Sequence, residues 1–140
     1  MRGIRAAFLA VALALMGSAC GGGGVLEAKD LLEQSKSLQS LAAEGALLAE
    51  DGASGKTTRV FMQEHSSDLF LAASQVEATL AQAKSEQPIV VQLRKLTVLA
   101  GRVSANLELL TVASREEQRV LVGELESAAR ACRTIGEALS

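Results

Sequence analysis

Apolar residues recur every three or four positions along most of this chain, and that spacing is typical of one buried face of an α-helix. The first such stretch spans about 25 to 50 and ends at the turn-forming segment 51–55, which contains two glycines. The second runs from Thr57 or Thr58, either of which can cap a helix, to Lys84. The predicted buried positions of the first helix are Leu31, Leu38, Leu41, Ala42, Gly45, Leu48 and Ala49. Those of the second are Phe61, Met62, Leu69, Ala72, Ala73, Val76, Leu80 and Ala83.

A third helix is predicted to start at Pro88, because proline is tolerated in the first helical turn. Its apolar positions alternate steps of four and three, which favours knobs-into-holes packing. They are Ile89, Leu93, Leu96, Ala100, Val103, Leu107 and Leu110. Val90, Val91, Val98 and Leu99 are additional apolar residues outside this repeat. A helix that is apolar nearly all round favours burial on more than one side, so these four residues form the predicted partner-binding face.

The fourth helix carries the repeat Leu121, Leu125, Ala128, Cys132, Ile135 and Leu139. Ser114 followed by Glu117 matches a capping box, which predicts a turn over 111–114. Residues 25–140 are therefore predicted to form an all-α antiparallel bundle of four helices. The alternative is a bundle of three helices with a long C-terminal helix, because neither glycine nor proline interrupts the chain between Glu108 and Val122.

The first 24 residues have a different character. Arg2 and Arg5 precede an apolar run from Ala6 to Met16, and small residues follow it, as in a secretory signal peptide. The segment Gly17-Ser18-Ala19-Cys20 resembles the lipobox of bacterial lipoproteins. The resemblance implies that residues 1–19 are removed and that Cys20 is lipidated on its thiol. Residues 20–24 would then be the lipidated cysteine and a glycine tether.

This resemblance covers only the signal, and it implies a lipid-anchored protein on the extracytoplasmic face of the cell membrane or outer membrane. Gly21 takes the place of the aspartate that favours inner-membrane retention in such proteins. Two alternatives stay open: a signal peptide that is cut without lipidation, and a signal that is retained as a membrane anchor. The apolar run is shorter than the roughly 20 residues that a membrane-spanning helix needs.

Charge and composition narrow the possible functions. Removal of Arg2 and Arg5 with the signal leaves 12 basic side chains against 16 acidic ones. Nucleic-acid binding requires a basic footprint, so none is expected. Phe61 and Phe70 are the only aromatic residues beyond the signal, which disfavours stacking on bases or sugars. If Cys20 is lipidated, Cys132 has no partner for a disulfide, and we expect it to be buried as a small apolar residue.

Two short motifs suggest chemistry but do not complete a site. Gly55-Lys56-Thr57 is similar to the end of a phosphate-binding P-loop, but Glu50 stands where the motif requires glycine, and a helix is predicted before it instead of a strand. Glu64, His65 and Asp68 lie within one helical turn and could offer ligands to a metal. His65 is the chain's one histidine, and we expect it at the surface, capped by Asp68. We therefore predict no catalytic site, no metal and no cofactor.

The third helix also carries a small basic patch of Arg94, Lys95 and Arg102. We expect these residues to pair with the acidic face of the first helix, and contact with anionic lipid headgroups is the alternative. Together the patterns predict a lipid-anchored, non-catalytic bundle that serves as a structural or protein-interaction module. It would bind an envelope protein or a second copy of itself through the third helix. The alternative is an extracytoplasmic binding protein that holds a small ligand or a metal in the bundle.

Overall fold

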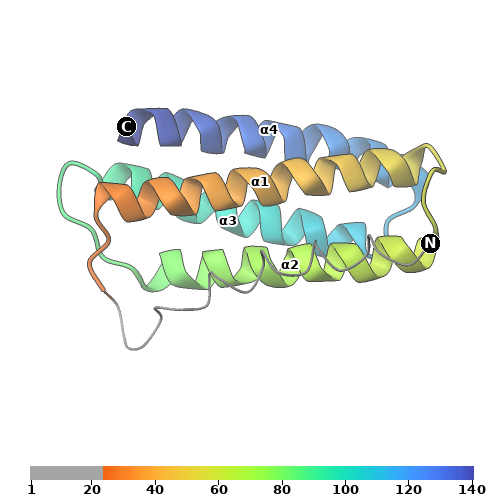
Figure 1. Ribbon diagram of the computed structural model, residues 1–140, viewed down its shortest axis with the longest axis horizontal. Helices are drawn as coiled ribbons and strands as arrows, with labels where there is room; N and C mark the ends of the chain where they lie inside the picture. The colour runs from red at the N-terminus through yellow and green to blue at the C-terminus, as the bar shows by residue number, and fades with distance from the viewer. Residues whose placement is uncertain (1–23) are drawn as a thin grey trace, which may run out of the picture.

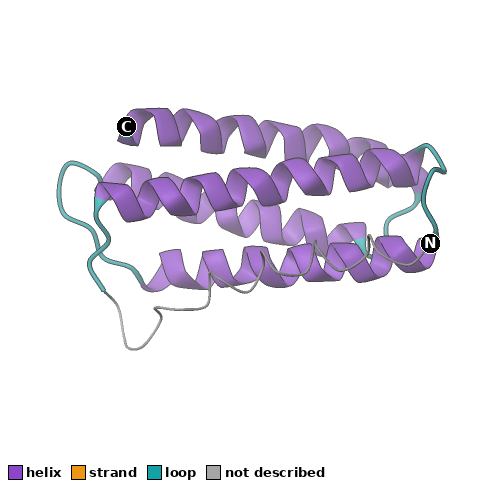
Figure 2. Ribbon diagram, viewed as in Figure 1, coloured by secondary structure: helices purple, strands orange, loops and turns teal. Residues whose placement is uncertain are grey.

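Four helices of similar length lie side by side in the computed structural model, which describes residues 24–140 (Figure 1). They are α1 (Ala28–Ala53), α2 (Arg59–Gln82), α3 (Val90–Leu110) and α4 (Arg115–Leu139). No strand is present within residues 24–140, where short connections join successive helices (Figure 2). The predicted all-α four-helix bundle is therefore confirmed. The predicted signal peptide 1–19, the predicted lipidation site Cys20 and residues 21–23 of the predicted tether lie outside the described residues.

The chain turns between α3 and α4, as the capping residues predict. Ser114 Oγ accepts a hydrogen bond from the backbone N–H of Glu117 at 3.3 Å. The Glu117 carboxylate in turn accepts one from the backbone N–H of Ser114 at 2.7 Å. This reciprocal pair satisfies two amides that have no partner inside the helix. One continuous C-terminal helix, the alternative from the sequence, is therefore wrong.

The other helix starts agree with the sequence less closely. Thr58 is the N-cap of α2, and its hydroxyl accepts from the backbone N–H of Phe61 at 3.2 Å. Pro88 does not begin α3 as predicted, because it lies in a turn and the helix begins at Val90. At the start of α1, Glu27 and Asp30 form a capping box that the sequence analysis did not identify. Its members are both acidic, whereas the usual signature has Ser or Thr at the N-cap.

Helix pairs in the bundle differ in how closely they pack. Contact is most extensive between α1 and α4 and between α2 and α3, whereas α3 with α4 and α1 with α2 pack less closely. Gly45 of α1 faces both α3 and α4. A Cβ at this position would stand 2.5 Å from Leu107 Cδ2 and 3.3 Å from Leu125 Cδ1. The absence of a side chain at Gly45 therefore lets α1 approach both helices.

The buried residues follow the predicted repeats with few exceptions. Leu93, Leu96, Ala100, Val103, Leu107 and Leu110 of α3 are all in the core. Phe61 was predicted to be buried, and this is wrong. Its surface is 51% exposed, and its ring stacks on His65 at a centroid distance of 5.4 Å. Ser66 is buried on the inner side of α2 and donates its hydroxyl to the Met62 carbonyl. A serine can occupy a core position when its hydroxyl donates a hydrogen bond to a carbonyl of its own helix.

The two ends of the bundle carry different features. Near its start, the described chain runs beside the α2–α3 connection: Leu26 N–H donates to the Lys84 carbonyl at 2.8 Å, and Lys84 N–H donates to the Gly24 carbonyl at 3.3 Å. We call this the tether end, and α3 begins and α4 ends there (Figure 1). The far end holds the α1–α2 and α3–α4 connections. The 26 residues of α1 separate the two ends by about 40 Å. No helix within residues 24–140 is long and apolar enough to cross a membrane.

Candidate functional site

An open groove lies between α3 and α4 at the tether end. These two helices pack less closely than α1 with α4 or α2 with α3. The groove has a volume of about 720 Å³ and its surface is mostly apolar. Val91 and Val98 are 47% and 62% exposed, while Leu99 is buried at its floor. The lining residues are Val91, Arg94, Lys95, Val98 and Leu99 of α3 and Ala131, Thr134 and Ile135 of α4. We call this set the α3–α4 groove.

Three of the four residues of the predicted partner-binding face line this groove. They are Val91, Val98 and Leu99. Val90 is half-buried and is not among the lining residues. The α4 side of the groove was not predicted, because Ala131 and Thr134 carry no pattern that separates a groove wall from an ordinary helix surface. Only the packing of α3 beside α4 brings the two walls together.

A second apolar hollow lies on the same side of the bundle, toward the far end. Leu109, Val112 and Val120 line it and are mostly exposed. Between the two hollows along both helices, Arg102 of α3 forms an ion pair with Glu124 of α4 at 3.2 Å. The outer side of α3 and α4 therefore offers two apolar areas separated by a polar pair.

The basic patch of α3 does not pair with α1 as predicted. Arg102 pairs with Glu124 of α4 instead. Arg94 and Lys95 line the α3–α4 groove and form no ion pair with any residue from 24 to 140. The acidic face of α1 lies elsewhere, so two positive charges remain beside an exposed apolar surface.

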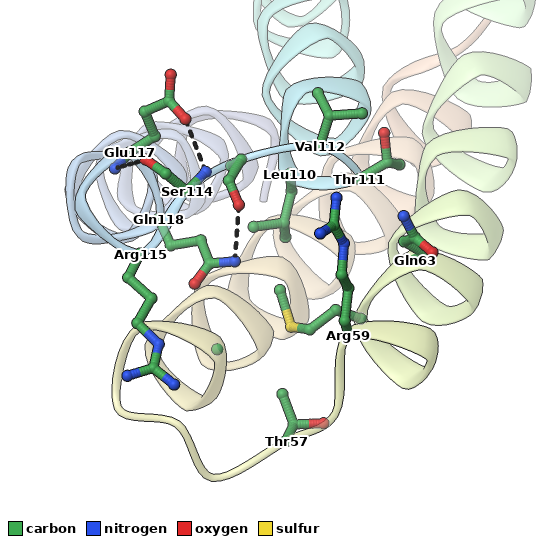
Figure 3. A pocket seen from close by; sticks show the side chains of 13 residues that line it. Thr57, Arg59, Gln63, Leu110, Thr111, Val112, Ser114, Arg115, Glu117 and Gln118 are labelled. Atoms are coloured by element: carbon green, nitrogen blue, oxygen red, sulfur yellow. Dashed lines mark hydrogen bonds between the residues drawn. The ribbon is translucent and has the colours of Figure 1, made fainter.

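A polar pocket of about 490 Å³ opens at the far end of the bundle (Figure 3). It lies between the start of α2, the end of α3 and the start of α4. Two arginines line it, Arg59 as the first residue of α2 and Arg115 as the first residue of α4. Thr57, Thr111 and Ser114 add hydroxyl groups and Gln63 adds an amide. We call this the far-end pocket.

Gln118 is a buried wall residue of the far-end pocket, only 8% exposed. Its Nε2 donates to the Ala113 carbonyl at 3.1 Å, whereas its Oε1 has no hydrogen-bond partner. Gly52 makes room for this amide, because a Cβ at position 52 would stand 2.8 Å from Gln118 Oε1. An unpaired buried acceptor costs about 1–3 kcal/mol. Gln118 was not predicted as a site residue, because its sequence position is that of an ordinary polar residue near the start of a helix.

The residues considered for metal binding are not gathered into a site. His65 Nε2 lies 2.8 Å from Glu44 Oε1 of α1, so the expected pairing with Asp68 is wrong. Among the described residues, no three His, Cys, Asp or Glu side chains are arranged to hold a metal ion. The segment that is similar to the end of a P-loop connects α1 to α2, and a helix precedes it in place of the strand that the motif requires.

Cys132 is fully buried in the core, as predicted, and burial raises the pKa of its thiol to about 11. Such a thiol is almost entirely protonated at neutral pH and reacts slowly.

Comparison with protein-family models, with curated proteins and with solved structures found no match.

Proposed function

We propose that this protein is a lipid-anchored envelope protein whose bundle binds an amphipathic helix of a partner protein in the α3–α4 groove. Residues 1–19 would be removed as a signal peptide and Cys20 would carry the lipid. The bundle would act by binding rather than by catalysis. The observation that carries this proposal is the exposed apolar surface between α3 and α4, to which Val91 and Val98 contribute exposed side chains.

Length and shape support a helix as the occupant. The outer side of α3 and α4 keeps apolar residues exposed from Val91 to Val112. This span corresponds to about 30 Å, or roughly 20 residues of a docked helix. Helix-in-groove binding uses apolar anchors at helical spacing. A matching partner would place such anchors at both ends and polar residues in the middle, opposite the Arg102–Glu124 pair.

Charge indicates which helix the groove would accept. Arg94 and Lys95 line the groove without an acidic partner among the described residues. Acidic residues flanking the apolar anchors of the partner would meet these two charges, and complementary charges favour both specificity and the rate of association. A helix flanked by basic residues would be repelled.

The position of the groove suggests where the partner lies. The groove is at the tether end, the same end as Gly24. Residues 21–24 span at most about 14 Å when fully extended. If Cys20 is lipidated, the groove is held close to the bilayer, and the partner helix would be one that lies near the membrane surface.

Synthetic 20-residue helices test this proposal directly. A peptide with apolar anchors and glutamate flanks is expected to bind residues 24–140, and Val98→Asp is expected to weaken that binding at least about tenfold, or 1.4 kcal/mol. Val60→Asp on α2 is the matched control, because Val60 is 63% exposed and lies outside the groove. A peptide with lysine flanks should bind more weakly than the glutamate peptide.

Three results would contradict the proposal. Equal weakening by Val98→Asp and Val60→Asp would indicate nonspecific apolar association. A dimer in sedimentation that Val98→Asp dissociates would make a second copy of this chain the occupant. Binding of the unlipidated chain to anionic vesicles, lost on Arg94→Gln and Lys95→Gln, would make the groove a lipid-contacting surface instead.

A further inference from the structure

We propose that residues 24–26, which we call the strap, regulate the α3–α4 groove by holding the start of α3 in place. Figure 1 shows the strap beside the connection from α2 to α3, and this connection leads directly into one wall of the groove. The inference rests on the proposed function, because it assigns a regulatory element to the same groove. With the strap docked, the groove has its full affinity for a helix; with the strap released, that affinity falls.

Three hydrogen bonds dock the strap. The Leu26 N–H donates to the Lys84 carbonyl at 2.8 Å, and the Lys84 N–H donates to the Gly24 carbonyl at 3.3 Å. Ser85 Oγ donates to the Leu26 carbonyl at 3.0 Å. The Leu26 side chain is half-buried and packs against the core, whereas that of Val25 is 60% exposed. The strap is thus held to the bundle although it belongs to no helix.

The start of α3 has few contacts of its own that fix it. Its N-cap residue, Ile89, forms no side-chain cap hydrogen bond, and its first turn contains no acidic residue. At the starts of α1, α2 and α4, by contrast, a side-chain oxygen accepts a hydrogen bond from a backbone N–H. Such a cap stabilises a helix start by about 1 kcal/mol. The start of α3 therefore depends on the connection before it, and the strap fixes that connection.

The start of α3 is also the tether-end part of the groove wall. Val91 is the second residue of α3 and lines the groove, and Arg94 and Lys95 follow one turn later. A short segment outside the helices opens at a lower free-energy cost than the core does. When the strap opens, Val91 loses its fixed position, and the affinity of the groove falls with the fraction of molecules that keep the wall formed. By linkage, a helix bound in the groove stabilises the docked strap by the same factor.

Leu26→Asp tests the inference, because a charge at this half-buried position opposes packing against the core. Val25→Asp is the matched control, since it places the same charge on the exposed neighbour. In residues 24–140 without any peptide, Leu26→Asp should accelerate hydrogen exchange of the Leu93 amide, which forms a backbone hydrogen bond with the N-cap residue of α3. The Gln118 amide forms the equivalent bond at the start of α4, and its exchange should be unchanged.

The helical peptide with glutamate flanks gives a second readout. Leu26→Asp should weaken its binding at least about fivefold, whereas Val25→Asp should leave the affinity unchanged. In the parent chain, the bound peptide should slow exchange of the Leu26 and Lys84 amides by a comparable factor. Ser85→Ala removes one of the three docking bonds, so it should weaken peptide binding less than Leu26→Asp does. It serves as the test if the Leu26→Asp variant fails to fold.

Three results would overturn the inference. The first is unchanged Leu93 exchange in Leu26→Asp, whatever the peptide does. The second is equal acceleration at Leu93 and Gln118, because the variant would then loosen the whole bundle. The third is equal peptide affinity of the Leu26→Asp and Val25→Asp variants. A parent chain that binds no helical peptide would instead overturn the proposed function, and faster exchange at Leu93 alone would still support the link between the strap and α3.

Discussion

Ser35 of α1 donates its hydroxyl to the backbone carbonyl of Cys132 on α4 at 2.6 Å, inside the most closely packed helix pair of the bundle. Both residues are buried. A Cβ at Gly136, one turn further along α4, would stand 3.4 Å from Ser35 Oγ, so a small residue there leaves space for the bond. This hydrogen bond fixes how α1 and α4 lie along one another.

Removal of this hydroxyl should destabilise the bundle modestly. Ser35→Ala is expected to lower the free energy of unfolding by about 1 kcal/mol, because one buried hydrogen bond is lost while the small side chain still fits. Urea denaturation measures the change, and Ser40→Ala on the exposed side of α1 is the control. A loss equal to that of the control would mean that the bond contributes nothing.

Two glycines should respond in opposite directions to alanine. Gly45→Ala is expected to destabilise the bundle by about 1–3 kcal/mol, because its Cβ would collide with Leu107, which is fully buried and cannot move aside freely. Gly123→Ala on α4 meets no atom within 4 Å and should stabilise the bundle by up to about 1 kcal/mol through helix propensity. Thermal unfolding of both variants checks the pair. If both stabilise, α1 is less closely packed than described.

Cys132 should make the bundle less stable at high pH. Burial raises the pKa of its thiol from 9.0 to about 11. The unfolded chain therefore releases this proton first, and stability falls as pH rises from about 9 to 11, by at most about 3 kcal/mol. Comparison of residues 24–140 with the Cys132→Ala variant across this range isolates the effect from the titration of lysines. Parallel pH profiles for the two chains would contradict the prediction.

The capping box at the start of α4 should show the opposite pH dependence. Backbone and side-chain hydrogen bonds with Ser114 lower the pKa of Glu117 below its usual 4.5. The stabilisation that Glu117 provides is present above the unfolded-state pKa and is lost as pH falls through the lowered one. Glu117→Gln should therefore be less stable than the parent at neutral pH, with the difference shrinking in acid. Ser114→Ala should cost about 1 kcal/mol at neutral pH.

The proposed lipid anchor at Cys20 predicts a specific mass for the mature protein. The protein purified from bacterial membranes should begin at Cys20 and carry the added mass of a diacylglyceryl group, and Cys20→Ser should remove both the cut and the added mass. A chain cut at this point without lipid would be a secreted bundle. An uncut chain beginning at Met1 would contradict the signal prediction.

The helices and the core were predictable because their repeat is strict. Leu93 to Leu110 of α3 and Leu121 to Ile135 of α4 follow the spacing of a buried helix face, and the structure buries them. Phe61 shows where this reasoning fails. An aromatic residue at the start of α2 fits the apolar pattern, yet it stacks on His65 at the surface while Ser66 takes the core. Periodicity alone does not distinguish neighbouring positions at a helix start.

The two candidate sites were predictable to different degrees. The α3 wall of the groove was predictable, because α3 has apolar residues outside its core repeat. Two of these, Val91 and Val98, line the groove. Its α4 wall and the far-end pocket depend on which helices and helix ends lie together. The spacing of residues within one helix does not predict that arrangement. Arg59 and Arg115 are 56 positions apart in sequence and line one pocket only because two helices begin at one end of an antiparallel bundle.

The backbone link between the start of the described chain and Lys84 also decides how the molecule would carry mechanical load. A pull on the proposed tether would reach Gly24 and Leu26, and both are hydrogen-bonded to Lys84 at 3.3 and 2.8 Å. Force applied through an anchor would therefore pass into α1 and, at the same point, into the connection between α2 and α3. The bundle would resist extraction from its tether as a whole, and the first turn of α1 would not have to bear the strain by itself.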